Sequence, residues 1–219
     1  MKRLIGYGAV ALLLATPAAA PAQFGGLGKL GHAFGGGVST GDGEAFLLNA
    51  AHSTKNVMIS AALLAQAVTN RADLTGAKAT IDALNNAQSV KELDAHRDEL
   101  ASNLQVLDQR ADLSGDIAAA YAQGDDQQKK LIGLAVANLA IGIVRNTQLA
   151  GQAPGMIKGI SRNPALATRI GEFKAAAELL GLQAKGLKGI VGSVPKLLAA
   201  AKVQGPAASA TSEPQPISL

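Results

Sequence analysis

Three histidines are the side chains best suited to acid–base or metal chemistry in this sequence, but their spacing does not favour either. His32, His52 and His96 are at least 20 positions apart, and none belongs to a motif with metal-ligand spacing. His52 and Ser53 are adjacent, so on a helix their side chains point about 100° apart. That is poor geometry for a nucleophile and its base. His96 lies among charged residues in a pattern typical of a solvated helix face.

Three further patterns resemble ligand sites and each lacks a required part. Gly28-Lys29 resembles the end of a P-loop, but the position five before it is Gln23 and the next residue is Leu30, where Gly and Ser or Thr are needed. Asp125-Asp126 suits the capping of a helix, and Asp42-Gly43-Glu44 lacks the further oxygen ligands of a calcium loop. The sequence therefore predicts no catalytic residue, no cofactor and no metal site. We expect a protein that is not an enzyme.

The composition limits the kinds of protein that this chain can be. It is 48% hydrophobic, 3% aromatic and 16% charged, with no cysteine in 219 residues. The apolar content excludes a chain that is disordered throughout. The scarcity of aromatic rings argues against stacking surfaces for single-stranded nucleic acid. The absence of cysteine excludes disulfides, thiolate catalysis and cysteine-ligated metals.

The first 22 residues have the three-part layout of a secretory signal peptide. A basic start at Lys2-Arg3 precedes an uncharged apolar run from Leu4 to Ala15, and small residues follow up to Ala22. The apolar run is shorter than the roughly 20 residues that a membrane-spanning helix needs. We therefore predict cleavage after Ala22 and export, to the periplasm or fully outside the cell.

Removal of the signal peptide changes the charge of the chain. The 20 basic residues become 18 against 16 acidic ones, which leaves a net charge of +2 instead of +4. Residues 23–150 carry a net charge of −3, whereas residues 151–204 carry +6. So small a total charge on an exported chain argues against a nucleic-acid partner.

Beyond the signal peptide, the sequence predicts an all-α fold with flexible ends. Residues 23–43 form a glycine-rich leader, with nine glycines between positions 24 and 43. Residues 44–204 have helical periodicity and form one helical bundle of about five to seven helices. Residues 205–219, which are rich in Pro, Ser and Ala, form a disordered tail.

The most apolar stretch, from Leu131 to Val144, is predicted to be the central helix of the bundle. Asn138 is its one polar side chain in 14 residues. A buried amide without a partner costs about 1–3 kcal/mol, so Asn138 must find a hydrogen bond. Ser89, Asp125 and Asn163 are expected to cap helices, and Pro154 is expected to interrupt one.

The last helical segment separates apolar from basic residues on a helical wheel, and no acidic residue occurs between Leu179 and Gln204. Four glycines weaken this helix when it is isolated, so it must pack against something. Pro195 is expected to kink or split it. The alternatives are its own bundle, an anionic membrane surface or an acidic protein partner. The residues predicted to make this contact are Lys185, Leu187, Lys188, Ile190, Val191, Val194, Lys196, Leu197, Leu198 and Lys202.

The hypothesis that follows is an exported, non-catalytic envelope protein that binds or scaffolds through this basic C-terminal segment. One alternative is a carrier that holds a small apolar ligand between helices near residues 131–144, where glycine and alanine are frequent. Another is an enzyme without a recognisable motif.

Overall fold

The computed structural model describes residues 38–69, 74–203 and 214–219. The predicted signal peptide (1–22) and most of the predicted leader (up to residue 37) lie outside the described residues. Residues 70–73 and 204 of the predicted bundle and residues 205–213 of the predicted tail lie outside them too. His32 and the Gly28-Lys29 pair lie outside them as well.

The described chain is all-α, as predicted, but it contains more helices than the five to seven expected. There are ten α-helices and one 3₁₀ helix in the described ranges, and no strand occurs there. Several are short, because chain segments expected to be continuous are divided. The elements are α1 (Thr40–Thr69), η3 (Thr75–Ala77), α2 (Lys78–Asn86), α3 (Val90–Asp94), α4 (Arg97–Asp108), α5 (Leu113–Gln123), α6 (Asp126–Ile160), α7 (Pro164–Ala167), α8 (Ile170–Gly186), α9 (Lys188–Val191) and α10 (Val194–Ala200).

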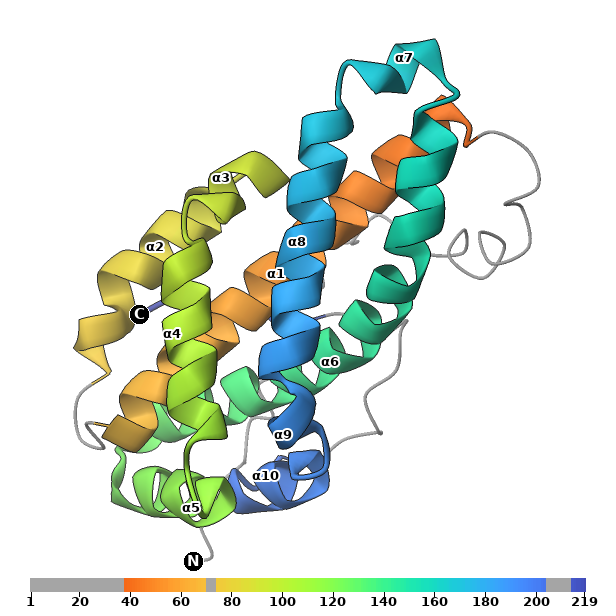
Figure 1. The fold of residues 1–219 in the computed structure, drawn as a ribbon. Coiled ribbons are helices and arrows are strands. Elements are labelled where there is room, and N and C mark those ends of the chain that lie inside the picture. Colours follow the sequence, from red (N-terminus) through yellow and green to blue (C-terminus); the bar gives the residue numbers. More distant parts are fainter. Residues whose placement is uncertain (1–37, 70–73, 204–213) are drawn as a thin grey trace, which may run out of the picture.

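Three long helices, α1, α6 and α8, form the centre of the fold (Figure 1). Helices α2, α3 and α4 cover α1 on one side, and α5 and α10 lie together at one end. The rings of Phe46 on α1 and Phe173 on α8 stack with 6.2 Å between their centroids. Most of α1 is buried, because its Ala, Leu and Val side chains face neighbours on several sides.

The predicted central helix is the first half of α6, and it is buried as expected. Gly142 lies so close to α1 that an added Cβ would be 2.5 Å from Cγ2 of Val57. The helix does not end at Pro154 but continues to Ile160. Ala153, Met156 and Ile160 keep the apolar spacing and are buried, and we attribute the continuation to this burial, which offsets the roughly 3 kcal/mol cost of a proline inside a helix.

Among the described residues, α6 is a helix whose length and composition would allow it to cross a membrane. However, 67% of its most apolar window is buried inside the fold. Such burial is typical of the core helix of a bundle.

The predicted caps are present, with differences in detail. Ser89 accepts a hydrogen bond from the Glu92 N–H (3.2 Å), but the Glu92 carboxylate accepts from the N–H of Gln88 (2.7 Å), one position earlier than the standard motif. Asp125 and Gln128 form a reciprocal capping box at the start of α6. Asn163 accepts from the Ala165 N–H (3.0 Å), with Pro164 next to it as the first helical residue.

Both ends of the bundle differ from the predicted boundaries. Helix α1 begins at Thr40, inside the predicted leader, because the Ser39 hydroxyl accepts a hydrogen bond from the Asp42 N–H (3.2 Å). Gly43 belongs to its first turn, where a Cβ would be 2.7 Å from a methyl group of Leu166.

At the other end, residues 214–219 do not behave as part of a disordered tail. They lie against α2 and α6, where Asn85 and Asn138 bond their main chain, and Ile217 is 3% exposed. Figure 1 marks this end of the chain near α2. Asn138, which the sequence required to have a partner, is buried and bonded to the main chain of Gln215. Its partner is therefore a segment that sequence patterns assigned to solvent.

Candidate functional site

The predicted contact segment is divided among the end of α8 and the two short helices α9 and α10. Helix α8 ends before Leu187, α9 ends before Gly192, and Pro195 lies in the first turn of α10, where a proline is tolerated. Two of the four glycines that weaken the isolated segment permit close approach to α4. A Cβ on Gly186 would be 2.8 Å from Leu104, and one on Gly189 would be 2.0 Å from the Asp108 carboxylate.

The ten predicted contact residues divide according to residue type. Leu187, Ile190 and Leu197 are buried, and Val194 and Leu198 are half-buried and pack on the core. Lys185, Lys188, Lys196 and Lys202 are exposed, as is Val191 at 48%. The apolar side of this segment therefore packs on its own bundle, which is one of the three alternatives that the sequence left open. The four lysines remain exposed, and we call them together the lysine face.

Lys202 is held more tightly than its exposure indicates. Its backbone is in the left-handed region (φ 50°), which ends the helical segment. Its ammonium group lies 5.8 Å from the centre of the Tyr121 ring on α5, within the range of a cation–π contact. This contact ties the end of the lysine face to the preceding helices.

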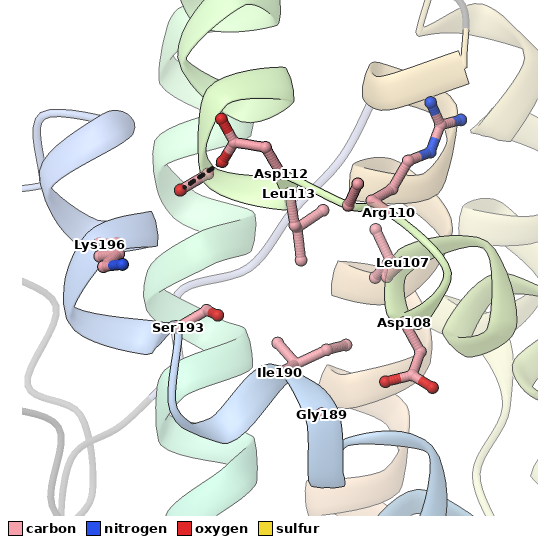
Figure 2. A pocket seen from close by; sticks show the side chains of 11 residues that line it. Leu107, Asp108, Arg110, Asp112, Leu113, Gly189, Ile190, Ser193 and Lys196 are labelled. Carbon is pink, nitrogen blue, oxygen red and sulfur yellow. Dashed lines mark hydrogen bonds between the residues drawn. The ribbon is translucent and has the colours of Figure 1, made fainter.

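A small pocket separates α9 and α10 from the turn between α4 and α5 (Figure 2). Its volume is about 150 Å³, enough for a few water molecules or a small polar group. Leu107, Leu113 and Ile190 project toward one another in it, and Ser193 and Lys196 lie on the side opposite Asp108. The guanidinium group of Arg110 points away and lies 3.6 Å from the Asp116 carboxylate.

Asp112, an acidic group that the charge of Lys196 affects, is already engaged in holding the fold. Asp112 caps α5 and accepts hydrogen bonds from the Gly115 N–H (2.9 Å) and the Ser114 hydroxyl (2.9 Å). These bonds, with a smaller contribution from the charge of Lys196, hold the pKa of Asp112 below its usual value. Asp112 is therefore a fixed anion, suited to binding and orientation rather than to general acid catalysis.

The other residues considered for chemistry lie apart from this pocket. Ser53 is buried and His52 is exposed, so the two do not form a nucleophile–base pair. Partial burial lowers the pKa of His52, and the nearby charges of Lys55 and Arg145 add to this effect. The His96 ring lies 2.9 Å from the Glu99 carboxylate on the surface. Within the described ranges, no three histidine or acidic side chains gather as a metal site.

Sequence reasoning missed a buried polar cluster at the centre of α1, α6 and α8. Gln183 donates to the Thr54 hydroxyl (2.8 Å), and Asn146 donates to the Gln183 side-chain oxygen (3.2 Å) and to the Leu180 carbonyl (3.3 Å). We call these three polar side chains the core triad. A signal for it was present, since Gln183 stands between Leu180 and Leu187 at helical spacing, on the apolar side of its helix.

Comparison with known proteins gave no match: no family model matches the chain, and no curated protein or solved structure is significantly similar to it.

Proposed function

We propose that this chain is an exported, non-catalytic envelope protein that binds an acidic protein partner through its lysine face. The observation that carries the proposal is the division of the C-terminal segment, in which Leu187, Ile190 and Leu197 are buried while the four lysines are exposed. No acidic residue interrupts the sequence between Leu179 and Gln204. Export is proposed from the signal-peptide pattern of residues 1–22 alone, with the periplasm as the proposed location.

The burial of the apolar side favours a protein over a lipid surface as the partner. An amphipathic helix that lies on a membrane inserts its apolar side roughly 5–10 Å into the headgroup region. Here that side is occupied by the bundle, and Val191 is its one strongly exposed large apolar side chain. Exposed lysines that are not accompanied by a free apolar surface cannot anchor the chain in lipid. They are suited to a protein–protein interface in which charged side chains at the edge attract the partner.

The acidic groups beside the lysine face would give such an interface a preferred orientation. Asp108 lies next to α9 at Gly189, and Asp112 lies near Lys196 across the small pocket. A partner rich in acidic residues would be attracted by the lysines and repelled at these two positions. Repulsion of this kind selects among partners of the same overall charge.

The test uses poly-L-glutamate as an acidic polypeptide and vesicles of anionic lipid as the competing surface. We expect the full chain to bind poly-L-glutamate at low salt and to lose this binding as salt rises. The variant Lys185→Gln/Lys188→Gln/Lys196→Gln should bind more than tenfold more weakly, since about 0.5 kcal/mol per lysine gives about 1.5 kcal/mol.

The matched control removes three exposed lysines elsewhere, at Lys130, Lys158 and Lys174. It has the same net charge as the test variant and should bind like the unaltered chain. An equal loss of affinity in both variants would show that only net charge matters and would contradict the proposal. Binding to anionic vesicles without binding to poly-L-glutamate would show that the partner is a membrane.

A further inference from the structure

Residues 214–219 lie against α2 and α6, and polar side chains hold their main chain. We call the surface that they cover, with the cavity beside Leu219, the groove. The Asn138 amide donates to the Gln215 carbonyl (2.6 Å) and accepts from the Gln215 N–H (2.9 Å). The Asn85 amide donates to the Ile217 carbonyl (3.0 Å), and the Lys78 ammonium group donates to the main-chain oxygen of Leu219.

These contacts fall on alternate residues, as in an extended strand that presents every second residue to the same side. Ile217 inserts its side chain into the core, whereas Gln215, Pro216 and Ser218 are exposed. The groove therefore contacts main-chain atoms that every peptide has, together with two apolar side chains, buried Ile217 and partly buried Leu219. We therefore expect the groove to accept many different side chains at the exposed positions and to require an apolar side chain at the position of Ile217.

Two prolines favour the bound conformation of this segment. Pro214 and Pro216 flank Gln215, the residue that Asn138 contacts through both its N–H and its carbonyl. Their rings fix φ near −65° and exclude many other conformations, so less conformational entropy is lost on binding. Neither proline needs to donate a hydrogen bond, since the N–H that Asn138 accepts belongs to Gln215.

The groove extends beyond the space that the segment fills. A cavity of about 290 Å³ adjoins Leu219, and its walls include Leu74, Lys78 and Leu131. Its lining combines apolar side chains with polar groups from the start of α6. A longer or bulkier peptide than residues 214–219 therefore finds further contacts there.

From these contacts we propose that the groove is a binding site for extended peptides of a partner protein, and that residues 214–219 occupy it as a competitor within the same chain. The peptides have an apolar residue at the position of Ile217 and favour extended backbone, as prolines do. Ten residues, 204–213, join Val203 to Pro214. Because the segment belongs to the same chain, a partner peptide must compete with an intramolecular contact. This site lies apart from the lysine face and does not depend on the proposed function.

The experiment releases the segment within the full chain by Ile217→Asp and adds a fluorescein-labelled peptide of residues 214–219. Placing a charge at a buried apolar position should expel the segment. Fluorescence anisotropy should then show the peptide binding at least about tenfold more tightly to this variant than to the unaltered chain. Adding Asn138→Ala to the variant should abolish the gain, and a peptide with aspartate in place of Ile217 should not bind.

Equal binding to the unaltered and Ile217→Asp chains, with helicity retained by circular dichroism, would overturn the proposal. If the Ile217→Asp chain loses its helicity, a second measurement decides. The chain has no cysteine, so Ser218→Cys, at an exposed position, carries a single environment-sensitive fluorophore. Unlabelled peptide at about 10 mM should displace the labelled segment and shift its emission. An unchanged emission at that concentration would contradict the proposal.

Discussion

Two buried asparagines on α6 serve different regions of the molecule. Asn138 and Asn146 are eight positions apart, each is 2% exposed, and Gly142 lies midway between them at helical spacing. Asn146 is bonded to side-chain and main-chain groups of α8, whereas Asn138 is bonded to the main chain of the terminal segment. Asn146 thus joins two core helices, α6 and α8, whereas Asn138 on the same helix holds a segment that can separate from the bundle.

The difference shows that a buried polar side chain can either stabilise the fold or hold a segment that is able to leave. The core triad is satisfied within α1, α6 and α8, so its hydrogen bonds break only when those helices separate. The Asn138 bonds can break when residues 214–219 leave, because water can then replace Gln215 as the partner. The first region stabilises the fold, and the second can exchange its occupant while the fold persists.

The largest expected effect is in the core triad. Gln183→Leu keeps a similar volume but leaves Thr54 and Asn146 without the hydrogen bonds shown at 2.8 and 3.2 Å. We expect the free energy of unfolding to fall by about 3 kcal/mol, measured by urea denaturation. The triple variant Thr54→Val/Gln183→Leu/Asn146→Leu should recover most of this loss, since no polar group is then left unsatisfied. A single variant as stable as the unaltered chain would contradict the role of the triad.

The next effect concerns the close approach of α1 and α6 between the two asparagines. Gly142→Ala should destabilise the chain, because its Cβ meets Val57, a stiff and fully buried side chain, at 2.5 Å. Gly151 is on the same helix with no atom within 4 Å of an added Cβ, so Gly151→Ala should stabilise slightly. We expect a difference of about 2 kcal/mol between the two variants in urea denaturation. Equal stabilities would show that Val57 moves aside freely.

A smaller effect is expected at Asn138. Asn138→Ala removes the two hydrogen bonds to Gln215 and should lower the free energy of unfolding by about 1 kcal/mol. In a chain that already carries Ile217→Asp, the same change should have almost no effect, because the segment has left. Denaturation of the two single variants and the double variant measures this coupling. Additive losses would show that Asn138 acts independently of the segment.

The smallest effect is a pH dependence that comes from His52 on α1. The folded chain lowers the pKa of His52 from 6.5, through partial burial first and the charges of Lys55 and Arg145 second. As the pH falls below about 6.5, the unfolded chain takes up the proton first, so the free energy of unfolding decreases. His52→Gln should remove this decrease, as measured by denaturation at about pH 7.5 and about pH 5.5. A decrease that persists in the variant would assign it to another group.

Local features of the fold were predictable from the sequence, and features that depend on distant partners were not. The caps at Ser89, Asp125 and Asn163 and the buried helix around Asn138 follow from spacing within a few residues. The division of the C-terminal segment at Leu187 was not predicted, since it accompanies the close approach of Gly189 to Asp108 on α4.

The candidate sites show the same limit. Separate basic and apolar sides of residues 185–202 were visible in the sequence, but the covering of the apolar side depends on the packed bundle. Docking of residues 214–219 depends on side chains 77 to 141 positions away, which no local pattern connects with a proline-rich segment.

The separation of the core triad along the chain has a consequence for the rate at which the protein folds. Thr54 and Gln183 are 129 positions apart, so their hydrogen bond forms only after a very long loop has closed. Local helices such as α3 and α4 can form much earlier. The triad therefore belongs to the final stage of folding, and weakening it accelerates unfolding more than it slows folding. The lifetime of the folded state, more than its rate of formation, depends on these three side chains.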